Sequence, residues 1–273
     1  MRRCRLAVLL PVLVLAGWAL LSMLAQYLPL QPDQIQLQQI LATPGEGALL
    51  GYDDLGRSIG DRMIVGARTS FLVSVWVVSL SLLLGTLLGT VSAYHGGWWD
   101  RIAVLFVDVF LAFPGILLAI ALAGLLGPGI GNVVIALTIV GWVGYARLSR
   151  AQVLSLKHRE HVQAAEALGS SKWRIIRKHL LPLMVAPLIV EATFGIAAVV
   201  IAEAGLSFLG LGVQPPGASW GAMIRDGTRY MLVAPHMVVA PGVAILAVVL
   251  AVNLLGDRLR DKLDIRTITE AKD

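Results

Sequence analysis

The sequence has little charge and almost no cysteine. Only 14% of its 273 residues are Asp, Glu, Lys or Arg, whereas 57% are hydrophobic and the mean hydropathy is +0.79. These values lie far outside the range of an ordinary soluble domain. The one cysteine, Cys4, cannot form an intrachain disulfide, and we interpret it as an incidental thiol. The composition therefore indicates an integral membrane protein with one polytopic domain.

Several catalytic motifs are also missing from the sequence. There is no GxxxxGK[ST] phosphate loop, so we do not expect the chain alone to bind ATP. The run from His158 to His161 matches neither HExxH nor HxxEH, and we interpret it as a solvated polar face rather than a metal site. No Gly-x-Ser-x-Gly elbow occurs either. We expect a chain that binds no cofactor or metal and is not itself an enzyme.

Six apolar segments are long enough to be membrane spans, because about 20 apolar residues cross the hydrocarbon core. The sequence therefore predicts an all-α polytopic protein with six transmembrane helices. The first span has an apolar core longer than that of a signal peptide, so we expect an uncleaved anchor. The expected spans are residues 6–28, 70–94, 102–126, 133–148, 183–205 and 237–255.

Two features within the spans predict local geometry. Pro114 lies inside the third span and should kink it, because proline removes a backbone hydrogen bond. Gly85 and Gly89 form a GxxxG step in the second span, which lets another helix approach closely. That helix could belong to this chain or to a partner.

Three acidic residues lie inside the expected spans and are candidates for a translocation path or gate. Asp108 could serve the structure near the membrane edge or take part in transport. Glu191 lies deeper and should face protein or a water-filled path. Glu203 should lie near the outer surface, in contact with water. Two further hypotheses use these acids, an intramembrane hydrolase and an ion-driven secondary carrier.

The distribution of basic residues predicts the orientation. Of 22 Lys and Arg residues, 17 lie at the chain ends or in the loops that are inside if both termini are cytoplasmic, with the long loop counted from Arg147 at its membrane edge, and the two outer segments hold 5. This bias fits the positive-inside rule. It also accounts for the net charge of +5 without a nucleic-acid partner, since the basic residues border apolar spans.

The longest inner loop, residues 150–182, has the pattern of a docking element for a soluble partner. A first helix should end at Gly169 in a left-handed turn, and Ser170 and Ser171 should cap a second helix that Pro182 closes. Each helix should have an apolar stripe. The stripes are Leu156, Val162, Ala165 and Leu168 in the first helix, and Trp173, Ile176 and Leu180 in the second.

This loop resembles the cytoplasmic "EAA" loop of permease subunits in binding-protein-dependent ABC importers. Gln163 stands where the family has Glu, and His179 where it has Ile. Four further stretches resemble the branch that imports dipeptides, oligopeptides or nickel. The residues that carry the loop resemblance and its implied ATPase-coupling role are Gln163, Ala164, Ala165, Glu166, Gly169, Leu181 and Pro182; the stretches are LGYDDLGRSIGDRMIVGARTSF, DVFLAFPG, AGLSFLGLGVQPPGASWGAMIRDG and NLLGDRLRDKLD.

The resemblance implies a type I ABC importer permease fold in a bacterial or archaeal cytoplasmic membrane. It implies a homologous second permease, two ATPase subunits that use ATP and Mg, and a periplasmic or lipid-anchored binding protein. Residues 1–28 would be the amino-terminal tail and first span, 29–69 an outer segment, and 70–273 the permease core. In the outer segment, Asp53, Gly56 and Arg57 match the family pattern. The substrate would be a dipeptide or oligopeptide, or else nickel or a metal–chelator complex.

Overall fold

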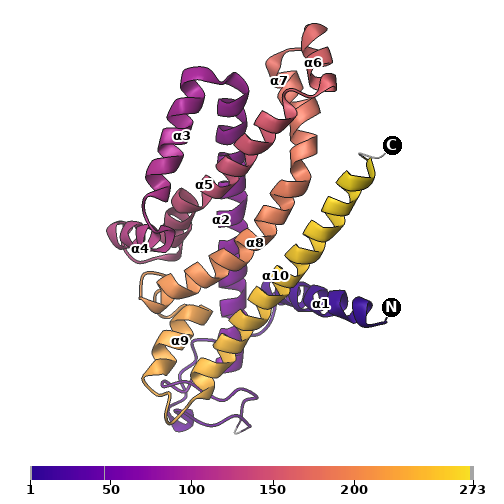
Figure 1. Ribbon diagram of the computed structural model, residues 1–273. Coiled ribbons are helices and arrows are strands. Elements are labelled where there is room, and N and C mark those ends of the chain that lie inside the picture. Colours follow the sequence, from indigo (N-terminus) through magenta and orange to yellow (C-terminus); the bar gives the residue numbers. More distant parts are fainter. Residues whose placement is uncertain (1, 46, 271–273) are drawn as a thin grey trace.

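The computed structural model describes residues 2–45 and 47–270, with side chains described for residues 9–45 and 47–263. This part of the chain is helical and contains no strand beyond one isolated bridge between Tyr52 and Ser58 (Figure 1). The elements are α1 (Arg2–Leu24), η1 (Leu37–Gln39), α2 (Ile59–His95), α3 (Gly97–Leu111), α4 (Gly115–Leu126), α5 (Ile130–Leu156), α6 (Glu160–Ala167), α7 (Lys172–Ile175), η2 (Ile176–Leu180), α8 (Leu181–Phe208), α9 (Trp220–Thr228) and α10 (His236–Glu270).

All six predicted spans are helical, but they are not equivalent. Four helices have the length and hydropathy of a membrane span among the described residues: Ile59–His95, Ile130–Leu156, Lys172–Phe208 and His236–Leu263. The predicted third span is a broken pair, α3 and α4. Within α1, the stretch Leu9–Leu24 is apolar. The all-α membrane architecture is therefore confirmed.

The predicted third span is bent far more sharply than a kink. Between α3 and α4 the axis turns by 86°. Pro114 is the N-cap of α4 with extended ψ, and Phe113 before it lies outside both helices. Proline has no N–H to donate, and it disfavours helical geometry in the preceding residue. The third span is therefore two separate helices, α3 and α4, and not one kinked helix.

Pro182 does not close the second helix of the loop, contrary to expectation. The chain is helical without interruption from Lys172 to Phe208. Just before the proline, residues Ile176–Leu180 form a π-helical segment, and the Leu181 N–H donates to the Ile176 carbonyl. A wider turn leaves room for the proline ring, which would otherwise clash with a carbonyl one turn earlier. The fifth span is thus fused to the loop.

The GxxxG step packs α2 against α5 of the same chain. A Cβ on Gly85 would meet the Trp142 carbonyl oxygen, and one on Gly89 would meet the Ala146 carbonyl oxygen. Only glycine allows this approach of the two backbones. Of the two partners considered for the GxxxG step, the structure shows a helix of the same chain.

The bundle has two distinct ends, and α1 crosses its side. Figure 1 places α6 and α7 at one end, beside the link between α2 and α3, and places α9 and the segment before α2 at the other. α1 lies across the long helices. The Trp18 indole N–H and the Ser22 hydroxyl both donate to the Ala67 carbonyl, at 3.0 and 3.1 Å. These bonds, with the edge contact of Trp18 on Phe71, hold α1 to α2.

The Gly89→Ala variant should lose about 1–3 kcal/mol of stability, because its methyl group must push α2 away from the α5 backbone. Gly205→Ala is the matched control, since a Cβ there meets no atom within 4 Å. Thermal unfolding of the two detergent-solubilised variants checks this. Equal unfolding temperatures would contradict the close contact.

Candidate functional site

The loop at the α6 end is built differently from the two-helix prediction. Its expected first helix is split, because Leu156 is the last residue of α5 and a turn over residues 157–159 separates it from α6. Gly169 does end α6 as predicted, with φ of +79°. The Ser170 N–H donates to the Ala165 carbonyl at 3.0 Å, which satisfies the end of the helix. Ser171 is an N-cap, but its side chain makes no capping bond.

The loop helices pack around an apolar core that they share with α2, α5 and α8, and two residues of the predicted stripes lie outside this core. Leu168 is 86% exposed and Trp173 is 58% exposed, so neither belongs to the buried stripe. Ile175, which the sequence pattern missed, is 1% exposed. Ile175 immediately precedes the π-helical segment, and Ile176 and Leu180 at the two ends of that segment are buried with it. The buried cluster contains Leu156, Val162, Ala165, Ile175, Ile176, Leu180 and Met184.

The loop residues predicted from the resemblance divide between this core and the exterior. Ala165 is 8% exposed and packs inside the loop, so its small size serves the chain itself. The remaining small and polar residues of α6 face outward. We define the loop surface as the exposed residues Gln163, Ala164, Glu166, Leu168 and Trp173. Leu181 is half-buried and Pro182 is exposed beside it.

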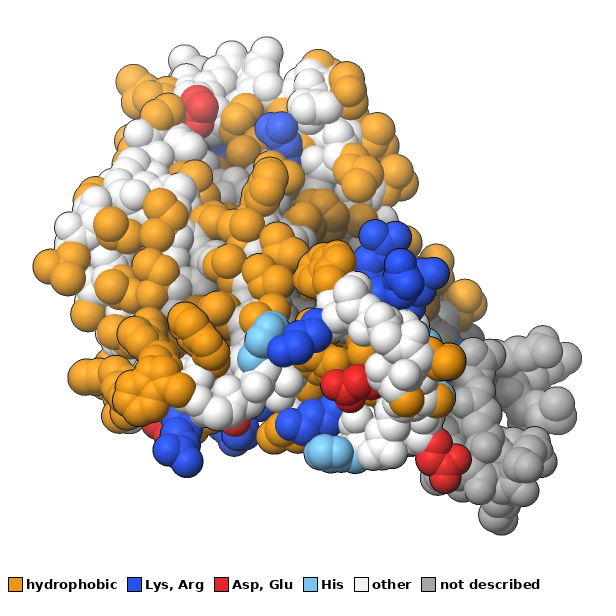
Figure 2. All heavy atoms as spheres, turned by 90° about the horizontal axis from the view of Figure 1, so that it is seen from above, with side chains coloured by type: hydrophobic (Ala, Val, Ile, Leu, Met, Phe, Trp, Pro, Cys, Tyr) orange, Lys and Arg blue, Asp and Glu red, His pale blue; other side chains and the backbone are white. Residues whose placement is uncertain are grey.

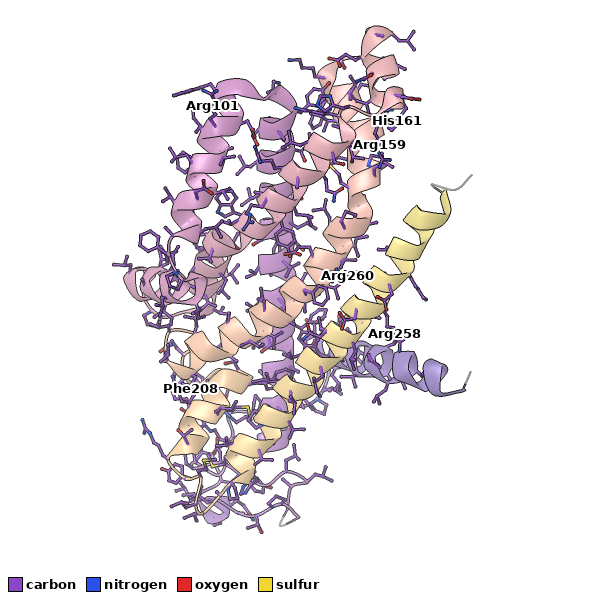
Figure 3. All side chains as sticks on the ribbon, in the orientation of Figure 1. Arg101, Arg159, His161, Phe208, Arg258 and Arg260 are labelled. Carbon is purple, nitrogen blue, oxygen red and sulfur yellow. The ribbon has the colours of Figure 1, made fainter. Side chains whose placement is uncertain are left out.

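Basic side chains surround the loop surface. Figure 2, which looks onto this end, shows Lys and Arg side chains grouped around it, whereas hydrophobic side chains cover much of the remaining visible face. Arg159 and His161 lie beside the loop surface, whereas Arg101 lies on α3, at the same end of the molecule but apart from the loop (Figure 3). The surface thus combines exposed Leu and Trp side chains with positive charge, which suits a protein partner.

At the opposite end, the structure brings together the three predicted residues of the outer segment in one buried turn. The Asp53 carboxylate accepts bonds from the backbone N–H groups of Leu55 and Arg57, both at 2.9 Å. It also accepts one from the Arg57 Nε at 2.7 Å. Gly56 has φ of +69°, and a Cβ there would meet the Gln36 carbonyl oxygen. The three residues therefore shape the backbone of this turn.

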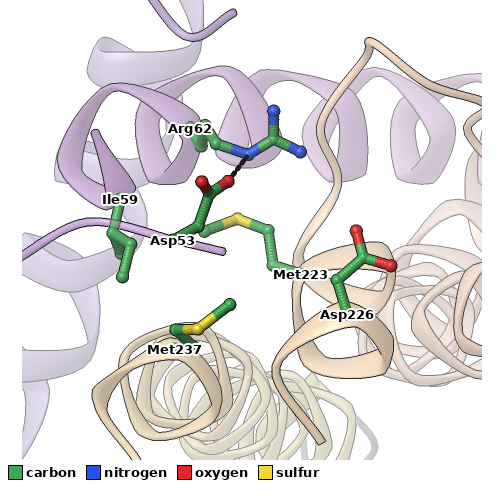
Figure 4. A pocket seen from close by; sticks show the side chains of 6 residues that line it. All are labelled: Asp53, Ile59, Arg62, Met223, Asp226 and Met237. Atoms are coloured by element: carbon green, nitrogen blue, oxygen red, sulfur yellow. Dashed lines mark ion pairs between the residues drawn. The ribbon is translucent and has the colours of Figure 1, made fainter. Parts of the chain in front are cut away.

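Arg62, which the sequence pattern did not single out, joins this turn to the helices. Its Nε lies 3.6 Å from the Asp53 carboxylate. Both side chains line a small pocket together with Asp226 (Figure 4). The pocket volume is about 10 Å³, close to the space of one water molecule. Asp54 follows Asp53 in the chain, and its burial, together with the Asp53 charge, raises the pKa of the Asp54 carboxyl group.

Two of the three membrane acids line one large cavity. It has a volume of about 1430 Å³ and lies among α2, α3, α5 and α8. Asp108 contributes from α3 and Glu191 from α8. α5 contributes two bases, Arg147 and Arg150, which the sequence pattern did not place with these acids. The cavity is the place where charged groups of three helices meet.

Glu203 does not belong to this cavity, and the expectation that it is wet is wrong. Its side chain is fully buried. The carboxylate accepts bonds from the hydroxyls of Ser70 at 2.8 Å and Ser207 at 2.7 Å, and Ser219 also interacts with it. The segment before α9 covers Glu203 with Ser219. The sequence shows only that Glu203 lies near the end of a span and does not show this cover. Glu203 ties α8 to α2 by polar contacts.

Comparison with known proteins identifies the family. Residues 82–269 match the family described as "Binding-protein-dependent transport system inner membrane component". The chain belongs to this family. It is a permease component of an ABC importer, a multi-pass protein of the inner membrane.

Individual relatives agree with this assignment. A "Glutathione transport system permease protein GsiD" of Pectobacterium atrosepticum is 43% identical over 221 residues, 81% of this chain and 73% of the relative. The protein of that name from Escherichia coli O157:H7 is 47% identical over 214 residues, 78% of this chain and 71% of the relative.

Solved structures support the fold of the permease. Two inward-facing crystal forms of the MetNI methionine ABC transporter match with TM-scores of 0.59 and 0.60. Their identities are 18% and 19%, and each match covers 73% of this chain and 95% of the solved one. The type I importer permease architecture is thereby confirmed.

Asp53→Asn should destabilise the permease by about 2–4 kcal/mol, because it removes the buried carboxylate that Arg57 and Arg62 share. Asp33→Asn is the matched control. Its half-exposed carboxylate lies 3.6 Å from Arg62, so we expect a loss below about 1 kcal/mol. Thermal unfolding at neutral pH measures the stability of both variants. Similar losses of stability would show that the buried ion pair stabilises the permease no more than the exposed one.

Proposed function

We propose that this permease imports short peptides, with glutathione as the first candidate. The observation that carries the proposal is the similarity to glutathione permeases, 43–47% identical over about four fifths of the chain. The cavity fits such a solute, because it is large and carries both acidic and basic side chains. Nickel or a metal–chelator complex could use the same architecture, but none of the relatives named above carries that description.

The permease would act as one part of a larger assembly. A homologous second permease would close the open side of the cavity, and the path would run between the two. Two ATPase subunits would use ATP and Mg, and a periplasmic or lipid-anchored binding protein would deliver the solute. The permease itself would catalyse no reaction. Membership of a binding-protein-dependent family supports each of these partners.

The loop surface is the proposed contact for the ATPases. Its exposed Ala164 leaves room for a partner backbone, and the exposed Leu168 and Trp173 offer apolar anchors. The loop is joined rigidly to the membrane helices, since α5 ends in its core and the helix from Lys172 runs on into α8. Movement of an ATPase would therefore move α5 and α8, two of the four helices that line the cavity.

The remaining proposed roles concern the path and the opposite end. Asp108 and Glu191 are proposed path residues, because both line the cavity. Glu203 takes a structural role instead, as its buried hydrogen bonds indicate. The turn at Asp53 and the segment around α9 would face the binding protein. This orientation puts both termini and the loop surface in the cytoplasm, as the bias of basic residues indicates.

Loss of this gene should abolish the glutathione uptake that depends on the transporter, and the wild-type gene should restore it. Ala164→Glu should fail to restore it, with uptake at least roughly tenfold lower, because a charge and added volume enter a packed contact. Uptake of labelled glutathione at matched membrane expression measures this.

Two controls separate docking from folding. Arg101→Glu adds negative charge at the same end of the molecule but outside the loop, and it should transport normally. Ala165→Glu should instead lower the amount of folded permease, since Ala165 lies in the loop core. Normal uptake with Ala164→Glu would remove the docking role, and wild-type uptake no higher than that of the deletion would remove the glutathione proposal.

Reporter fusions test the orientation. A fusion after Gly217 should behave as extracytoplasmic and one after Lys157 as cytoplasmic, because 17 of the 22 basic residues lie on the side assigned to the cytoplasm. Alkaline phosphatase and fluorescent-protein fusions report the two sides. A cytoplasmic Gly217 would invert the proposed arrangement.

A further inference from the structure

One face of α5 brings a base to the wall of the cavity. Gly144, Arg147 and Ala151 all line it. Their spacing of three and four residues puts them on the same side of the helix. Gly144 and Arg147 are separated by about 4.5 Å along the axis, less than one helical turn. The Arg147 side chain is exposed.

Glu191 of α8 reaches the same face of α5. A Cβ on Gly144 would lie 3.4 Å from the Glu191 Oε1, so the carboxylate rests directly over the glycine. Glu191 is half-buried and lines the cavity together with Arg147. Because Gly144 has no side chain, the Glu191 carboxylate lies against α5 less than one helical turn along the axis from Arg147. An acid from one helix and a base from another therefore face one space.

This acid and this base are not paired in the described part of the chain. None of the ion pairs within 4.0 Å involves Arg147 or Glu191. Arg150, in contrast, donates two bonds of 2.8 Å to the Asp100 carboxylate. Both arginines line the cavity, but Arg150 is paired with Asp100, whereas Arg147 has no ion pair among the described side chains. Unpaired charges within a membrane bundle mark functional positions.

We propose that Arg147 and Glu191 form a binding station for a zwitterionic short peptide, which rests on the proposed peptide import. Arg147 binds the carboxylate end, because guanidinium and carboxylate match in a two-bond geometry. Glu191 binds the ammonium end. A dipeptide spans roughly 7 Å when extended, and the long arginine side chain adjusts to it. Two contacts near solvent hold the solute weakly enough for release.

Charge exchange tests the station in cells that carry the complete transporter. Glu191→Lys and Arg147→Glu should each lower uptake of labelled glutathione and dialanine at least roughly tenfold, because one end of the peptide then meets a like charge. The double variant Glu191→Lys/Arg147→Glu should recover most of the uptake, since the peptide can bind in the reverse direction. The doubly neutral Glu191→Gln/Arg147→Gln should not recover it.

The controls separate a peptide-binding station from an acid and a base that serve only each other. Arg101→Glu makes the same charge reversal at an exposed position outside the cavity lining and should stay within about twofold of wild type. Recovery in the doubly neutral variant would show that the two residues merely pair with each other, which overturns the station. Single variants that transport normally, or a double variant without recovery, overturn it as well. Wild-type cells without peptide uptake would instead refute the proposed function.

Discussion

The close packing of α2 against α5 is the contact on which the rest of the structure depends. Gly85 and Gly89 bring α2 onto the α5 backbone at Trp142 and Ala146, with no side chain between them. Close-packed contacts transmit displacement instead of absorbing it. The cavity lies along this pair of helices, with α3 and α8 as its other walls. Any change in the approach of α2 and α5 therefore changes the width of the cavity.

The same pair of helices is tied to both ends of the permease. At one end α5 finishes in the core of the loop, and a continuous helix from Lys172 leads back into the bundle as α8. At the other end the buried Glu203 carboxylate joins α8 to Ser70 of α2. The loop surface and the opposite end are thus connected through rigid helices. A partner that moves the loop acts on the cavity without a flexible linker between them.

The charges of the bundle fall into two groups with different physical roles. Asp53, Arg57 and Glu203 are buried, and each is satisfied by hydrogen bonds or ion pairs. Such groups define geometry, because breaking one partner leaves a costly unpaired charge. Arg147 and Glu191 are directed to a large cavity and have no ion-pair partner among the described side chains. Hydration or a solute must satisfy them, which is why we propose these two residues for transport, whereas the buried groups define the architecture.

The sequence alone determined the features that depend on neighbours in the chain, namely the helical apolar runs and the left-handed turn at Gly169. Tertiary structure decided the rest. Phe113 and Pro114 break a span at a right angle, whereas a π-helical turn carries the helix through Pro182, and both prolines look alike in sequence. Leu168 faces outward and Glu203 lies buried because of residues distant along the chain. Arg147 and Glu191 meet only where α5 and α8 pack over Gly144, and local periodicity contains no information about that contact.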